Sequence, residues 1–360
     1  MTETVALSEY EARALRQVED HKADFAATPS RPIIPEGTRS ALKDTGEQVA
    51  SRLRRFPGFD TAAQAAKNSY AKAAEGLGGM TSKVTQYTLS PEGIISTYQR
   101  LGAPVDELAD IRRLDLKVVE KDAKPRRLDL AYAGAAAAEG AMAGLAITGG
   151  ELFVTVGSVA SVGLLGVPSL GLVTTVTAGD AAAVLALCSR VVAHTAFYYG
   201  YDPTDPAEEV FAMSVMNLGS AVTKSGKYAA YIELSQVSEA LGADASWSGL
   251  NRELVPQIAD RFARAFGVRL AKTKIGQFVP VAGIAAGAGL NYWIVQQVAT
   301  EAYWTYRERF VNEKLGITTL SVPDRPEGVD EPEEGSIDLL QYVRDASATP
   351  DDVAPGALES

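Results

Sequence analysis

The sequence predicts an all-α protein, built as a multi-helix bundle whose tightly packed central helices are rich in glycine and alanine. Three observations support this class. Alanine and glycine are abundant, while runs of β-branched residues are scarce outside one stretch. Apolar residues recur at helical spacing, and several segments begin with residues that cap helices. An apolar content of 46% with 22% charged residues is typical of a globular protein.

The first 37 residues are expected to form a polar helix and a linker, detached from the main domain. Residues 8–26 have helical character, and Ser8 with Glu11 forms a capping box in which each side chain satisfies a backbone N–H. The segment Thr28–Gly37 contains three prolines, which are typical of a linker.

Residues 38–315 are expected to form one helical domain. Ser90-Pro91-Glu92 predicts a short helix, because proline fits the first turn, where its missing N–H costs nothing. Asp205-Pro206-Ala207-Glu208 is a strong helix start that combines an N-cap, a proline and a first-turn carboxylate, and its helix is expected to reach about Lys224. Further helices are expected near 226–241 and 252–274.

Two stretches of this domain carry no charge, namely Leu152–Gly179 and Ile275–Thr300. Each exceeds the roughly 20 apolar residues that cross a bilayer. The first is rich in Gly, Ser, Thr and Val and the second in Gly, Ala and Val, and each contains a proline, Pro168 or Pro280. A hairpin is favoured over a straight span in the first. Three dispositions follow: the stretches cross a membrane, lie on it, or pack inside the protein.

Glycine pairs within or beside these stretches predict close helix packing. Gly140 and Gly144, and likewise Gly283 and Gly287, share one helix face, so backbones can approach closely in a membrane or in a soluble core. Basic residues flank the stretches and either hold anionic lipid headgroups or form ordinary solvated faces. These residues are Lys121, Lys124, Arg126, Arg127, Arg269, Lys272 and Lys274.

Residues 316–360 are expected to form an acidic, disordered tail. From Val322 onward there are eleven acidic residues and two arginines, so most of the net charge of −11 lies there. One apolar patch, Ile337–Val343, is either a docking motif for a protein partner or a closing turn. The nearly neutral remainder argues against nucleic-acid binding, which needs concentrated Lys and Arg.

Catalytic signatures are weak, so enzymatic activity is the less favoured expectation, and no cofactor is expected. His194 and the single cysteine, Cys188, fall in apolar helical runs and are expected to be packing residues. Buried carboxylates in a bundle can bind metal, but the paired Glu-x-x-His motifs of such sites are missing, so no metal site is expected. Glu139 and Asp180 are instead expected to cap helices or to pair with a basic residue such as Arg190 or Lys224. The polar N-terminus lacks the features of a signal peptide, which favours a cytoplasmic location.

Several motifs resemble the bacterial EcsC family. They are EGAMAG at Glu139–Gly144, AGD at Ala178–Asp180, YYGYDP at Tyr198–Pro203 with the following EEVFAM, GQFVPVAGIAAGAGLNYWIV, and AYWTYRERF at Ala302–Phe310. The resemblance extends over about residues 40–312 and implies a largely helical, membrane-associated protein in the cytoplasm. It transfers no catalytic residue. The family positions that it implies are Glu139, Gly140, Asp180, Gly200, Tyr201, Asp202, Lys272, Pro280, Gly283 and Asn291.

Three functions are therefore expected, in order of preference. The first is a non-enzymatic protein at the inner face of the cell membrane that contacts or binds lipid through its Gly-rich helices, as an accessory to transport or secretion. The second is a soluble enzyme or small-ligand-binding protein with a pocket near Glu139, Asp180 and the Tyr201–Asp202 turn. The third is an adaptor that docks a partner through the acidic tail. The candidate lipid- or ligand-binding residues are Glu139, Gly140, Gly144, Asp180, Tyr201, Asp202, Lys272, Pro280, Gly283, Gly287 and Asn291.

Overall fold

The computed structural model describes residues 6–27, 90–123, 184–242, 254–275, 283–329 and 337–347, and for 123, 268, 270–275, 283–290, 346 and 347 the backbone alone. Within these ranges every regular element is a helix, which confirms the all-α prediction. Residues 184–198 are also helical. The named elements are α1 (Glu9–Ala27), α4 (Pro91–Arg100), α5 (Leu108–Ile111), the π-helix η1 (Val118–Ala123), α8 (Pro206–Ser220), α9 (Lys224–Gly242), α10 (Val255–Ile275), α11 (Gly283–Lys314) and α12 (Leu339–Ser347).

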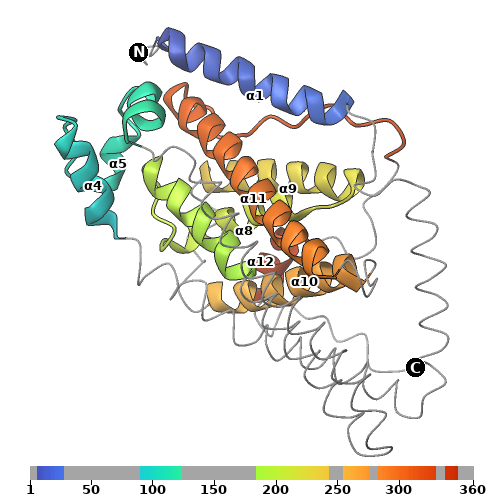
Figure 1. Ribbon diagram of the computed structural model, residues 1–360. Coiled ribbons are helices and arrows are strands. Elements are labelled where there is room, and N and C mark those ends of the chain that lie inside the picture. The colour runs from blue at the N-terminus through green and yellow to red at the C-terminus, as the bar shows by residue number, and fades with distance from the viewer. Residues whose placement is uncertain are drawn as a thin grey trace, which may run out of the picture.

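The long helix α11 is the central element of the bundle. It runs obliquely across the molecule, with α8 and α1 packed against it (Figure 1). Helices α8 and α11 approach closely at Gly219 of α8, where a Cβ atom would lie 2.4 Å from the Cα of Val298. Only glycine allows two helix backbones to meet at this distance, because any larger residue would overlap the partner backbone. Tight glycine packing is therefore present, at a residue that the sequence patterns did not single out.

Helix α1 packs against α11, so the expectation of a detached N-terminal helix is wrong. The predicted capping box is present, with Ser8 N–H donating to Glu11 and Glu11 N–H donating to the Ser8 hydroxyl at 3.0 and 3.2 Å. Ala14 and Val18 are buried. Lys22 is buried too, and it pairs with Glu308 of α11 and donates to the Ser321 carbonyl at 2.6 Å. The helix is polar in sequence because buried ion pairs, as well as apolar contacts, attach it to the bundle.

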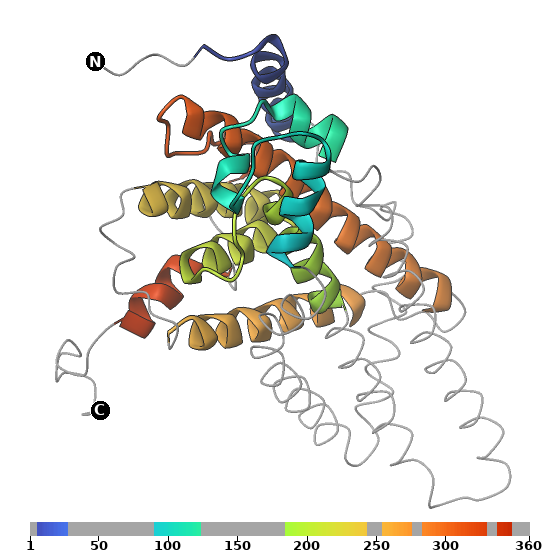
Figure 2. The same cartoon turned by 90° about the vertical axis from the view of Figure 1, so that its left-hand side faces the viewer.

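The two predicted proline-led helix starts are confirmed. The Ser90 hydroxyl accepts from Gly93 N–H at 3.1 Å at the start of α4, and the Asp205 carboxylate accepts from Ala207 N–H at 3.0 Å at the start of α8. Helix α8 ends at Ser220, four residues before the predicted end. Figure 2 shows α4 and α5 lying beside the helices at 184–198 and α8.

Described parts of the C-terminal tail are ordered against the bundle, which corrects the expected disorder for residues 316–329 and 337–347. Ile337 and Leu339 are buried. Asn217 of α8 donates to the Ile337 carbonyl at 3.2 Å, and Glu233 of α9 accepts the Leu339 N–H at 3.1 Å. Of the two interpretations of Ile337–Val343, this packing supports the closing element.

Of the two uncharged stretches, the structure describes part of the second and none of the first. Residues 283–300 form the first part of α11, and Ile294, Val295 and Val298 belong to the protein core. This supports packing inside the protein for the described side chains. The stretch at 152–179 lies outside the described residues, as do 28–89 and the rest of 124–183.

Among the helices that the structure describes, none combines the length and the apolarity needed to cross a membrane.

Candidate functional site

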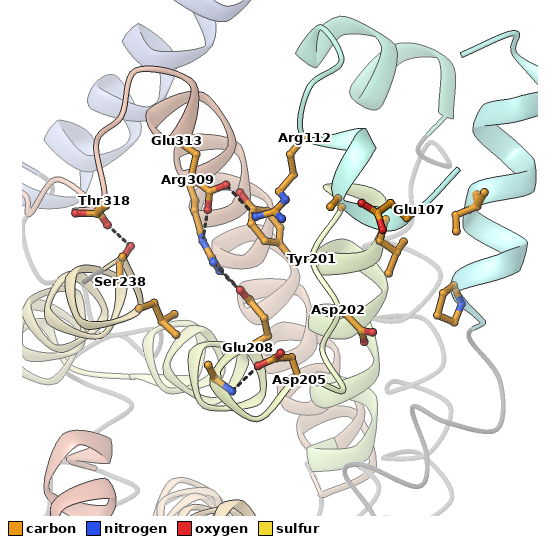
Figure 3. Close-up of a pocket in the computed structure, with 18 of the residues that line it drawn as sticks. Glu107, Arg112, Tyr201, Asp202, Asp205, Glu208, Ser238, Arg309, Glu313 and Thr318 are labelled. Carbon is orange, nitrogen blue, oxygen red and sulfur yellow. Dashed lines mark hydrogen bonds and ion pairs between the residues drawn. The ribbon is translucent and has the colours of Figure 1, made fainter. Parts of the chain in front are cut away.

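A cavity of about 710 Å³ lies where α4, α5, the turn at 200–205, α9 and the end of α11 meet. Figure 3 shows Tyr201 and Arg112 near its middle, with Glu107 and Asp202 on one side and Arg309 and Glu313 on the other. Cavities of about 300–1,000 Å³ hold ligands the size of cofactors and drugs.

Gly200 fixes the turn that borders the cavity. Its φ of 84° lies in the left-handed region, and its N–H donates to the Phe197 carbonyl at 3.0 Å. The next N–H, of Tyr201, reaches back to the Ala196 carbonyl at 3.0 Å, which completes a Schellman cap on the helix at 184–198. A Cβ at position 200 would lie 2.7 Å from the Leu108 carbonyl oxygen. Gly200 therefore both ends the helix and lets α5 approach the turn.

Arg309 of α11 is the centre of the charged network in the cavity. Its guanidinium makes a two-pronged ion pair with Glu208 of α8, with N–O distances of 2.7 and 2.5 Å, and its Nε donates to Glu313 at 3.1 Å. Burial alone lowers the pKa of Arg309, but Glu208, Tyr201 and Glu313 together outweigh burial and raise it above the usual value. Arg309 is thus a fixed cation that joins α8 to α11.

Tyr201 lies between two guanidinium groups. Arg309 Cζ is 4.1 Å and Arg112 Cζ is 5.4 Å from the centre of its ring, so both cations contact the aromatic faces. Tyr201 is only 2% exposed, and its hydroxyl has no hydrogen-bond partner among the described residues. Burial raises the pKa of this hydroxyl well above its usual value, so the group stays neutral.

Carboxylates outnumber cations around the cavity. Six acidic and two basic residues line it, and the two arginines are already paired with Glu208 and Glu313. The other four carboxylates belong to two turns. They are Asp106 and Glu107 before α5, and Asp202 and Asp205 before α8.

Of the predicted candidate residues that the structure describes, Tyr201 and Asp202 line the cavity, together with the family position Gly200. Asp202 also accepts from Thr204 N–H at 2.9 Å, which holds its turn. Asn291 is fully buried in α11 and lies outside the cavity lining. Gly283 and Gly287 fall in the first turns of α11, and Lys272 and Lys274 in the last turns of α10.

The flanking basic residues also separate. Arg269 of α10 donates to the carbonyl and the side-chain oxygen of Asn217 at 3.2 and 2.9 Å, so it joins α10 to α8. Lys121 is exposed at η1. The remaining candidates lie outside the described residues; they are Glu139, Gly140, Gly144, Asp180, Pro280, Lys124, Arg126 and Arg127.

Sequence reasoning missed most of the residues that build the cavity. Arg112, Glu208, Arg309 and Glu313 were not chosen, although Glu208 and Arg309 fall in the quoted runs EEVFAM and AYWTYRERF. Charged residues embedded in otherwise apolar runs were the available signal, because such residues are rarely buried without a partner.

Two further buried polar clusters hold α11 in place. Glu120 of η1 accepts from the hydroxyls of Tyr10 and Tyr199 at 2.6 and 2.8 Å and pairs with Arg307 at 3.1 Å. Glu301 pairs with Lys227 at 2.6 Å and contacts His21 at 3.4 Å. These contacts satisfy buried charges and join elements distant in sequence, which is a structural role.

Within the described residues, no group of three His, Cys, Asp or Glu side chains is placed to hold a metal ion. Cys188 is fully buried, and burial raises the pKa of its thiol far above the usual value, as expected for a packing residue. His194 stacks on Tyr198 with ring centres 5.2 Å apart. Neither group lines the cavity.

Part of this chain is similar to a known protein family and to a bacterial protein. The EcsC protein family matches residues 166–311, a range that contains the 200–205 turn and Arg309. An uncharacterised protein of Bacillus subtilis (strain 168), YdbA, is 28% identical over 143 residues, which is 39% of this chain. The chain spans about half of that relative, 49% of its length. No solved structure matches the chain.

The resemblance seen in the sequence over residues 40–312 is thus confirmed for its C-terminal part, whereas EGAMAG at Glu139–Gly144 lies before the matched range. Residues 166–311 of this chain, which carry the turn at 200–205 and Arg309, are similar to the EcsC protein family.

Proposed function

We propose that this chain is a helical protein that binds a small molecule in the cavity beside the 200–205 turn. The observation that carries the proposal is the size of the cavity, about 710 Å³, together with its position at the junction of five chain segments. Ligand sites favour such junctions, because convergent elements supply polar groups from several directions.

The local geometry supports a preformed site. The Schellman cap at Gly200 and the ion pairs of Arg309 fix both walls without any ligand. A preformed cavity costs little ordering entropy on binding, which favours affinity.

A blocked cavity tests the proposal. Ala109 of α5 lines the cavity and is half-buried, so Ala109→Trp would fill it, whereas Ser96→Trp on exposed α4 surface is a matched control. The purified full-length chain would be screened against small molecules of varied charge by thermal shift and titration calorimetry. We expect at least one compound to bind the wild type and Ser96→Trp, but not Ala109→Trp. Equal binding to all three proteins would overturn the proposal.

Contact with lipid at the inner face of the cell membrane is a second candidate. It is favoured by the uncharged sequence Leu152–Gly179 and by the exposed Lys121 that precedes it. Flotation of the purified protein with anionic and neutral vesicles is the test, followed by a carbonate wash of cell membranes. Absence of the protein from every vesicle and membrane fraction would remove this candidate.

Docking of a protein partner through Ile337–Val343 is less favoured, because Ile337 and Leu339 are buried in the chain's own core. A partner would have to displace α12 from Asn217 and Glu233 before it could contact this segment.

A further inference from the structure

We infer that the cavity takes an elongated organic cation, in which two or more ammonium or guanidinium groups are joined by an aliphatic chain. The inference rests on the proposed binding function and names the class of ligand. Four features carry it: carboxylates without an ion pair, their spread over two turns, apolar side chains in the same lining, and a buried hydroxyl without a partner.

The first feature is charge. Arg309 and Arg112 are occupied by Glu208 and Glu313. The four other lining carboxylates, Asp106, Glu107, Asp202 and Asp205, form no ion pair with any described lysine or arginine. Their hydrogen bonds come from neutral donors, such as Ala207 N–H to Asp205 and the Thr204 hydroxyl to Asp202 at 2.7 Å. An incoming cation would therefore meet uncompensated negative charge.

The second feature is the spread of that charge. The four carboxylates come from two different turns, before α5 and before α8. Over the described part of the chain they do not converge into a set of three that could coordinate one metal ion. Charges separated in this way fit a ligand that has its own cationic groups at separate positions.

The third feature is the apolar wall. Pro91 and Ile95 of α4, Leu108 of α5 and Leu241 of α9 line the same cavity. Methylene groups between two ammonium groups would lie against these side chains and lose contact with water, which contributes to binding.

The hydroxyl of Tyr201 is the remaining polar group. Tyr201 lines the cavity, is 2% exposed, and its hydroxyl lacks a partner in the described structure. A phenol oxygen accepts hydrogen bonds, so an ammonium N–H that reaches it would satisfy a buried polar atom.

Spermidine is a suitable probe, compared with citrate and triethylene glycol as anionic and neutral molecules of similar size. Titration calorimetry on the full-length chain would measure their affinities at low and moderate salt. We expect spermidine to bind best and to weaken as salt rises, because salt screens the exposed carboxylates. Ala109→Trp should abolish the binding.

Charge-removing variants then locate the site. Asp202→Asn and Asp205→Asn keep the side-chain oxygens that hold the turn and cap α8, and Glu107→Gln keeps its shape. Each should weaken spermidine about fivefold, in line with one charge pair in water. Glu92→Gln, exposed on α4 and outside the lining, should leave the affinity unchanged.

The outcomes separate this inference from the proposed function. If the three variants bind spermidine as the wild type does, the cation binds elsewhere and the inference is wrong. If citrate or a neutral compound is the ligand that Ala109→Trp blocks, the cavity binds ligands but not cations. If no compound of any charge binds, both statements fail.

Discussion

The described side chains of α11 before and after Thr300 are buried by opposite means. Its first part, up to Thr300, has no charged residue, and Val298 meets the backbone of α8 at Gly219. Its second part starts at Glu301 and buries Glu301, Arg307, Glu308 and Arg309 with exposures of 1–8%.

Uncharged and charged sequence stabilise this helix through different interactions. The uncharged half gains stability from close packing, which needs small residues and tolerates no added volume. The charged half is stable because every buried charge has a partner on another element, so each charge fixes which element packs there. For residues 291–300, the absence of charge is thus explained by a dry helix interface.

Removing the central cation should cause the largest loss. Arg309→Met leaves Glu208 and Glu313 without their cation, and breaking a buried pair in this way costs about 3–5 kcal/mol. Urea unfolding of the variant and the wild type would measure the loss. Adding Glu208→Gln to Arg309→Met should recover part of the stability. A loss no larger than that of Arg261→Met, at an exposed pair, would contradict the comparison.

The second-largest effect is expected in the pH dependence of stability, which should differ between the charged and uncharged parts of α11. Burial by itself raises the pKa of Glu301, but the charges of Lys227 and His21 outweigh it and bring the pKa to about 2. In the folded protein the pKa of Glu301 lies below its usual value. The ionised carboxylate therefore stabilises the fold above pH ~4.5, and this stabilisation is lost as the pH falls towards 2. Glu301→Gln should therefore cost roughly 3 kcal/mol at pH 7 and little near pH 2.

The measurement is the free energy of unfolding of both proteins from pH 2 to 7. A gap between wild type and Glu301→Gln that stayed constant over this range would show that the charge of Glu301 is not its source.

A side chain added in the interface of the uncharged part of α11 should lower the stability of the protein. Gly219→Ala places a methyl group against Val298 and should cost about 1–3 kcal/mol, with no dependence on pH. Gly93→Ala in α4 is the control, because the nearest atom to its Cβ is 3.4 Å away and alanine favours helix by about 1 kcal/mol. Thermal unfolding of both variants at pH 5 and 8 would measure the loss of stability. If Gly219→Ala and Gly93→Ala had equal melting temperatures, the close contact at Gly219 would be refuted.

The smallest effect is expected at the surface. Arg261 and Asp345 pair at 3.0 Å between α10 and α12, with side chains about 40% exposed. Asp345→Ala should cost less than about 1 kcal/mol, and the loss should shrink in high salt. A loss comparable with that of Arg309→Met would mean that exposure does not decide the strength of these pairs.

Local signals in the sequence predicted local structure well. Ser90-Pro91 and Asp205-Pro206 marked helix starts, and Ser8 with Glu11 marked a capping box, because these effects involve residues only two or three positions apart. Tyr201 and Asp202 line a cavity in the structure, while their role in binding a ligand stays a prediction.

Long-range partners could not be predicted in this way. Arg309 meets Glu208 across 101 residues and Lys22 meets Glu308 across 286, and no periodicity within a helix encodes such a pairing. The polar face of α1 therefore looked like solvent-exposed surface, although Lys22 is 7% exposed. The apolar patch at Ile337–Val343 was ambiguous for the same reason, since its partners Asn217 and Glu233 lie over 100 residues away.

The pairing of Lys22 with Glu308 and Ser321 also affects when α1 can pack during synthesis of the chain. A ribosome that adds about 5–20 residues per second needs roughly 15–60 s to make the 286 residues between Lys22 and Glu308. During that interval α1 has emerged, but the helix against which it packs does not yet exist. Helix α1 therefore reaches its final place only after the chain has been translated through Ser321, although it is made long before α11.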